Sequence, residues 1–212
     1  MCSYQRSVNQ KHHIMKGIFH NMECGMKMEE IDPAFGELDG NHMLVNSFLS
    51  AVIFELAIKS MWELSHSKVF GDDEISKYGH FIHKVYPCLK GDFHKFIRNE
   101  YEVEVAHFRN ELQEILNSGQ GGNYTEDERT FILSCPYFSL KECLKENRDI
   151  VVHGKYKFQA GNKINVVTGI LPCSAPNNEP VNCHRQPSPF LEKIMNYIQI
   201  QLHAPDYVKN LL

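Results

Sequence analysis

The sequence lacks the short motifs that identify many enzymes at once. It has no Gly-rich phosphate-binding loop, no nucleophile elbow and no His-Glu-x-x-His segment. No two of its seven cysteines are spaced as Cys-x-x-Cys, their number is odd, and we expect no signal peptide. These absences disfavour a P-loop enzyme, a zinc peptidase and a disulfide-stapled secreted protein. We expect reduced thiols in a cytoplasmic protein.

Long apolar runs and a strong excess of one charge are missing too. The most apolar stretch, residues 44–62, contains Asn46, Glu55 and Lys59, which a membrane span would not normally carry, so we expect no membrane partner. A formal net charge of -4 argues against binding nucleic acid over the whole surface, but it allows a local basic patch. A chain of 212 residues buries enough surface to fold without metal or disulfide staples.

Helical periodicity covers most of the chain between residues 41 and 155. The predicted helices span about residues 41–66, 74–86, 92–117, 125–135, 139–153 and 189–203. Thr125-x-x-Glu128 and Ser139-x-x-Glu142 are capping-box patterns that open two of them. No internal repeat or low-complexity tract is present. The class is therefore mainly α, a helical bundle.

Three segments do not follow the helical period. Residues 1–40 are Met-rich and weakly patterned, and we expect an irregular arm or a short hairpin there. Apolar residues alternate around Ala160-Gly161-Asn162, which predicts a β-hairpin within residues 156–166. Five prolines make residues 172–189 a surface loop. The organisation predicted for residues 1–212 is one domain with a helical core at about 41–155, the arm, the hairpin and Pro-rich loop of 156–189, and a closing helix.

The chemistry-bearing segment is residues 146–156, Glu-Asn-Arg-Asp-Ile-Val-Val-His-Gly-Lys-Tyr. It places Arg148 and His153 five residues apart near the end of a predicted helix. With six Arg and twelve His in the chain, an Arg followed by four to six residues and then a His should occur about once by chance, and this does occur at Arg6 before His12 and His13. Context must therefore decide whether the segment is functional.

Two upstream segments supply that context. Residues 54–60 read Phe-Glu-Leu-Ala-Ile-Lys-Ser, with Glu55 and Lys59 one turn apart, and residues 79–86 read Gly-His-Phe-Ile-His-Lys-Val-Tyr. Together with Arg148-Asp149-x-x-x-His153, these segments resemble the HEPN superfamily of helical proteins, many of which are ribonucleases in toxin and antiphage systems. The resemblance covers about residues 44–155. A minimal member of that family lacks the hairpin and the Pro-rich loop that are predicted here after the motif.

The resemblance implies a metal-independent endoribonuclease with no cofactor. Arg148 would bind phosphate, His153 would carry protons, and Asp149 would support the imidazole. It places Glu55 and Lys59 near the motif helix, where Glu55 would hold Arg148, and His80 at a helix start. It also implies RNA as substrate, a homodimer with a composite cleft, a toxin or abortive-infection setting, and an antitoxin or other regulatory protein as partner.

The residue types suit this chemistry. A His with an ordinary pKa near 6.5 can exchange protons with the 2′-hydroxyl and the leaving 5′-oxygen. Arg can grip two phosphate oxygens at once. Asp149 lies four residues before His153, on the same helical face. The plain structural alternative is that Arg148 forms a salt bridge with Glu55, and that His153 is a helix C-terminal cation.

A basic strip surrounds the motif. Cationic residues at 141, 145, 148, 155, 157 and 163 outnumber three acidic ones, and aromatic residues are interleaved with them. Lys145, Lys155, Tyr156 and Lys157 are therefore candidate RNA contacts, although a solvated charged surface explains them equally well. No cluster has the paired spacing of a zinc site. The alternative function is a catalytically silent HEPN-like module that binds a nucleotide or a partner protein.

Overall fold

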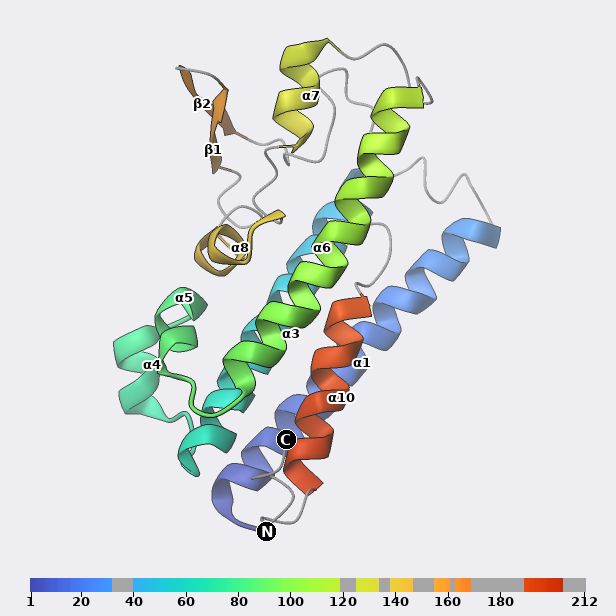
Figure 1. Ribbon diagram of the computed structural model, residues 1–212. Coiled ribbons are helices and arrows are strands. Elements are labelled where there is room, and N and C mark those ends of the chain that lie inside the picture. Colours follow the sequence, from blue (N-terminus) through green and yellow to red (C-terminus); the bar gives the residue numbers. More distant parts are fainter. Residues whose placement is uncertain are drawn as a thin grey trace.

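The structure, a computed structural model, describes residues 1–31, 40–118, 125–133, 138–146, 155–160, 163–168 and 189–203. Within these residues the fold is mainly α, as the periodicity predicts (Figure 1). The helices are α1 (Ser3–Ile31), α3 (Gly40–His66), α4 (Asp72–Tyr78), α5 (Ile82–Val85), the 3-10 turn η1 (Tyr86–Cys88), α6 (Phe93–Ser118), α7 (Glu126–Leu133), α8 (Leu140–Glu146) and α10 (Pro189–His203).

Helix α3 lies at the centre of the packing. Helices α1 and α10 run along it, and α5 and η1 pack against its other side (Figure 1). Its buried positions include Ile53, Phe54, Ala57, Ile58 and Met61. These positions recur at one-, three- and four-residue steps, which makes a broad apolar face rather than a narrow stripe. Such a face suits a helix with neighbours on several sides.

The expectation of an irregular arm at residues 1–40 is wrong. Residues 3–31 form the long helix α1, whose buried face carries Val8, His12, Met15 and Met22. Their spacings of four, three and seven residues follow the helical period. The pattern was weak in the sequence because a histidine occupies one buried position, and because polar side chains stand between the apolar ones.

Helices α3, α6 and α10 meet in an aromatic cluster. The Phe54 ring lies 6.5 Å from the Tyr101 ring and 5.5 Å from the Phe190 ring, and Tyr101 and Phe190 are 5.2 Å apart, all between ring centroids. The two contacts of Phe190 are edge-to-face, an arrangement that aromatic quadrupoles favour. The cluster fixes α6 and α10 on the central helix. The predicted bounds of α3, α6 and α10 agree with the structure to within one residue.

The helix predicted for residues 74–86 is broken in the structure. Helix α4 ends at Gly79, which has a φ of 57° and donates its N–H to the carbonyl of Ile75 at 2.7 Å. A positive φ is disfavoured for residues that carry a Cβ, so glycine ends the helix here. The chain then restarts as α5 and η1. The prediction missed the break because the apolar spacing continues across it.

Two short strands are the described elements that are not helical. Strand β1 (Lys155–Ala160) pairs antiparallel with β2 (Lys163–Thr168), with Lys157 opposite Val166. Helix α7 lies beside β1. Residues 172–188 of the predicted loop lie outside the described residues.

Candidate functional site

A cleft of about 520 Å³ opens between α5, η1, α6 and α8. Figure 1 shows α5 and α8 next to each other on one side of the bundle, with α6 beside them. Three separate segments of the chain, residues 83–87, 98–105 and 138–144, therefore contribute to the site. Its lining residues are His83, Tyr86, Pro87, Arg98, Tyr101, Glu102, Val105, Phe138, Ser139, Leu140, Lys141 and Leu144.

The lining is divided between apolar and polar groups. Apolar surface comes from Tyr101 and Val105 of α6 and from Leu140 and Leu144 of α8. Val105 and Leu140 are half-buried, so part of their surface faces the cleft. Sites for small molecules combine such an apolar wall with a few polar groups that orient the ligand. This cleft has both.

Two exposed cations, Arg98 and Lys141, stand at the cleft on different helices. In the part of the chain that the structure describes, neither makes an ion pair with a carboxylate. Five other lysines do form such pairs: Lys11, Lys59, Lys68, Lys145 and Lys193. Two cations without carboxylate partners, facing one cleft, can bind an anion.

The polar floor of the cleft contains Tyr86 and His83. Burial raises the pKa of the Tyr86 phenol above its ordinary value of 10, and the positive charge of Arg98 opposes that rise. The phenol is therefore neutral at physiological pH and stacks on His94, with 4.6 Å between the ring centroids. The Nδ1 atom of His83 is buried and, among the described residues, has no hydrogen-bond partner. A buried polar atom without a partner costs about 1–3 kcal/mol.

Helix α8 joins the cleft to the predicted motif. Ser139 caps it, because the Ser139 side chain accepts a 3.5 Å hydrogen bond from the Glu142 N–H and its carbonyl accepts one of 2.8 Å from the Cys143 N–H. Buried Cys143 and Leu144 hold the helix on the bundle. The described part of α8 ends at Glu146.

The motif itself, Arg148, Asp149 and His153, lies outside the described residues, between α8 and β1. Lys155, Tyr156 and Lys157 form the first half of β1, opposite residues 166–168 of β2. The structure therefore describes what stands immediately before and after the motif in the chain.

Glu55 and Lys59, one helical turn apart, form a pair within α3. Their side chains form an ion pair of 2.7 Å on α3 and are both largely buried, and the Lys59 Nζ atom lies 5.3 Å from the centre of the Phe70 ring. Lys145 is exposed and lies 3.8 Å from the carboxylate of Glu142.

His80 stacks against Phe81 at 4.6 Å between ring centroids and is not among the residues that line the cleft. It lies in the turn between α4 and α5, just after the helix break at Gly79. Of the predicted supporting residues, the structure thus joins Glu55 to Lys59 and leaves His80 apart from the cleft.

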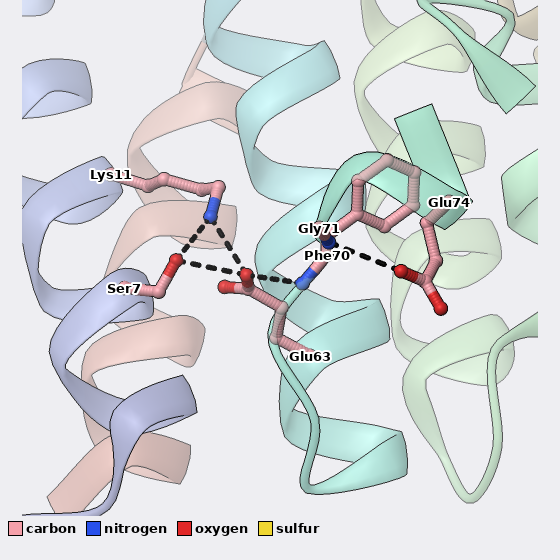
Figure 2. A network of polar contacts seen from close by, with 6 residues as sticks. All are labelled: Ser7, Lys11, Glu63, Phe70, Gly71 and Glu74. Carbon is pink, nitrogen blue, oxygen red and sulfur yellow. Dashed lines mark hydrogen bonds and ion pairs between the residues drawn. The ribbon is translucent and has the colours of Figure 1, made fainter. Parts of the chain in front are cut away.

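A second polar cluster joins α1 to α3 (Figure 2). The Oε1 atom of the fully buried Glu63 accepts hydrogen bonds from the Ser7 hydroxyl at 2.9 Å, the Lys11 ammonium at 2.9 Å and the Phe70 N–H at 2.8 Å. Lys11 also donates to the Ser7 hydroxyl at 2.7 Å. Two side chains of α1 thus donate to one carboxylate oxygen of α3. The cluster is a clamp between helices.

Sequence reasoning missed most of the cleft. Arg98 follows the buried Ile97 on a long amphipathic helix, where an isolated arginine reads as part of the solvated face. His83 and Tyr86 were assigned to one continuous helix. Lys141 was included in the basic strip, but nothing in the sequence linked it to Arg98. Only tertiary packing brings positions 83, 98 and 141 together.

Among the described residues, no group of three or more His, Cys, Asp or Glu side chains is arranged to hold a metal ion. None of the helices in the described ranges combines the length and apolar character needed to cross a membrane. Comparison of the chain with models of protein families, with curated proteins and with solved structures finds no match. Function must therefore be argued from the residues of this chain.

Proposed function

We propose that this protein is a metal-independent endoribonuclease of the HEPN type. His153 takes the proton of a ribose 2′-hydroxyl, and the resulting oxygen attacks the adjacent phosphorus. Arg148 holds the non-bridging oxygens, and the 5′-oxygen leaves with the proton that the protonated His153 returns. The products are a 2′,3′-cyclic phosphate and a 5′-hydroxyl. Asp149 orients the imidazole of His153.

One observation carries this proposal. The helix that precedes the motif in the chain, α8, forms a wall of a cleft that holds Arg98 and Lys141. Arg148 follows the last described residue of α8 by two positions. An RNA backbone bound at the cleft would thus contact the helix that directly precedes the motif in the chain. Arg98 and Lys141, which form no ion pair within the described residues, supply the phosphate contacts that the overall charge of -4 does not.

The rest of the assignment follows the resemblance to the HEPN superfamily. The fold is a HEPN-like bundle with a β-hairpin after the motif. The protein forms a symmetric homodimer whose paired motifs line one cleft. Its role is that of a cytoplasmic toxin or antiphage protein restrained by an antitoxin. Lys145, Lys155, Tyr156 and Lys157 extend the RNA contacts. Glu55 already pairs with Lys59, so its carboxylate would serve both Lys59 and Arg148.

The test is incubation of the purified protein with total RNA in excess EDTA. We expect cleavage by the wild type that leaves cyclic phosphate ends, and none by His153→Ala or Arg148→Ala. His13→Ala is a matched control, because His13 is exposed on α1 and belongs to the chance Arg-His spacing near the N-terminus. Equal cleavage by the His153 variant would remove the motif from the mechanism.

The alternative is a catalytically silent HEPN-like module that binds a nucleotide or a partner protein. The cleft favours it, because an apolar wall with cations at its edge binds a ligand whether or not His153 reacts. Expression distinguishes the two functions. An active nuclease should be toxic to its host, and His153→Ala should relieve that toxicity, whereas a binding module should express equally well in both forms.

A further inference from the structure

We infer that the cleft between α5, α6 and α8 is a subsite for one nucleotide of single-stranded RNA. The phosphate binds between Arg98 and Lys141, and the base lies against the apolar wall formed by Tyr101, Val105 and Leu140. The inference rests on the proposed function in taking RNA as the ligand. It assigns binding to residues that are distinct from Arg148 and His153.

The phosphate side is defined by charge. Arg98 lies on α6 and Lys141 on α8, so an anion between them would bridge two helices. Within the described residues neither cation has a carboxylate within ion-pairing distance, so neither must give up an ion pair on binding. Glu102 lies one turn after Arg98 on α6, also lines the cleft, and forms no described ion pair with it. A carboxylate at that position can accept a hydrogen bond from a ribose hydroxyl.

The base side is defined by shape and polarity. Val105 and Leu140 present apolar surface from opposite helices, and Tyr101 is fixed behind them by its contacts with Phe54 and Phe190. A wall held rigidly by the core can receive a flat ring without rearrangement. Apolar and aromatic surfaces bind bases of any sequence, because every base has a π-face.

Size and strandedness narrow the ligand. A cleft of about 520 Å³ lies within the size range of small-ligand sites, so it accommodates one nucleotide but not an RNA duplex. Bases inside an RNA duplex are stacked and cannot enter such a cleft, whereas bases in loops and single strands can. The subsite therefore selects single-stranded segments.

The first experiment measures binding of a fluorescent 2′-fluoro oligouridylate, which has no 2′-hydroxyl and so cannot be cleaved by the proposed route. Arg98→Gln and Lys141→Gln should each weaken binding by about fivefold or more, and each should lower the slope of log K against log salt by about 0.7. Lys95→Gln is the matched control. It removes the same charge from an exposed position of α6 that does not line the cleft. Equal effects of all three substitutions, or no binding by the wild type, would overturn the subsite.

The second experiment tests the base. An abasic ribose-phosphate oligomer of the same length should bind the wild type more weakly than the oligouridylate. Val105→Phe fills the apolar side of the cleft and should abolish that difference without changing charge. An unchanged preference in this variant would place the base elsewhere.

The two proposals can fail separately. If cleavage of total RNA depends on His153, but Arg98→Gln binds the oligouridylate as tightly as the wild type, the subsite alone is refuted. Binding that depends on Arg98 without any cleavage would refute the nuclease alone. Circular dichroism of each variant confirms folding, and exposed Arg98 and Lys141 are not part of the core.

Discussion

Lys11 of α1 and Glu63 of α3 form an ion pair of 2.9 Å in which the carboxylate is fully buried and the lysine side chain is 17% exposed. The pair fixes the orientation of α1 on the central helix. The same Glu63 oxygen accepts the N–H of Phe70, so the pair also holds the chain segment that follows α3 (Figure 2). One carboxylate thus couples three parts of the fold.

Removing the lysine from this pair should destabilise the protein strongly. Lys11→Met leaves a buried charge without its cation, and we expect a loss of about 3 kcal/mol in the free energy of unfolding. Urea denaturation followed by circular dichroism measures it. Lys16→Met, at an exposed position of the same helix, should change little. A Lys11 variant as stable as the wild type would show that the pair does not hold α1.

Two neighbouring residues test whether α1 belongs to the core. Met15 is fully buried and Ile14 is 52% exposed. Met15→Ala should lower the free energy of unfolding by about 2–5 kcal/mol, because it removes a buried side chain and leaves a cavity. Ile14→Ala should change it by about 0.5 kcal/mol or less. The comparison uses thermal and urea unfolding, and equal small effects would mean that α1 is dispensable to the fold.

The sequence predicted the long helices α3, α6 and α10 well because the spacing of their own apolar residues is enough to identify a helix. Helices α3, α6 and α10 each bury apolar residues at helical spacing, and Pro189 stands at the first position of the last helix. Helix α1 was missed because its polar buried contacts involve a partner that is remote in sequence. His12 and Lys11 look like surface residues until Glu63 and the neighbouring helices are in place.

The cleft was beyond the reach of sequence reasoning for a similar reason. Arg98 and Lys141 are separated by 43 positions, and no local pattern links them. Their proximity depends on α8 packing beside α5 and α6. By contrast, the ion pair of Glu55 and Lys59 was predictable, because a four-residue spacing on a helix places two side chains together whatever the tertiary fold.

Two glycines should respond oppositely to alanine. Gly79 has a φ of 57° and a ψ of -128°, so Gly79→Ala should cost about 1–3 kcal/mol from backbone strain, although an added Cβ meets nothing closer than 3.8 Å. Gly17 lies within α1, with no atom within 4 Å of an added Cβ, so Gly17→Ala should stabilise by about 0.5–1 kcal/mol. The midpoints of thermal unfolding should move in opposite directions. A neutral Gly79 variant would contradict the helix break.

The buried His12 should make the protein sensitive to acid. Burial lowers its pKa below the ordinary 6.5, the nearby charges of Lys16, His13 and His203 lower it further, and a hydrogen bond with the Met195 backbone opposes them. In the unfolded chain the His12 imidazole therefore takes up a proton near pH 6.5, whereas in the folded protein it takes up that proton only at a lower pH. The free energy of unfolding is unaffected above that pH and decreases as the pH falls below it.

The decrease should amount to at most about 1.4 kcal/mol per pH unit for this one proton, down to the folded pKa. Urea unfolding between pH 5 and pH 7.5 measures the slope. His12→Gln should flatten the curve below pH 6.5, because glutamine cannot take up the proton in either state. His13→Gln should leave most of the slope in place, because that ring is exposed. A His12→Gln protein that loses stability on acidification as steeply as the wild type would assign the acid sensitivity to another group.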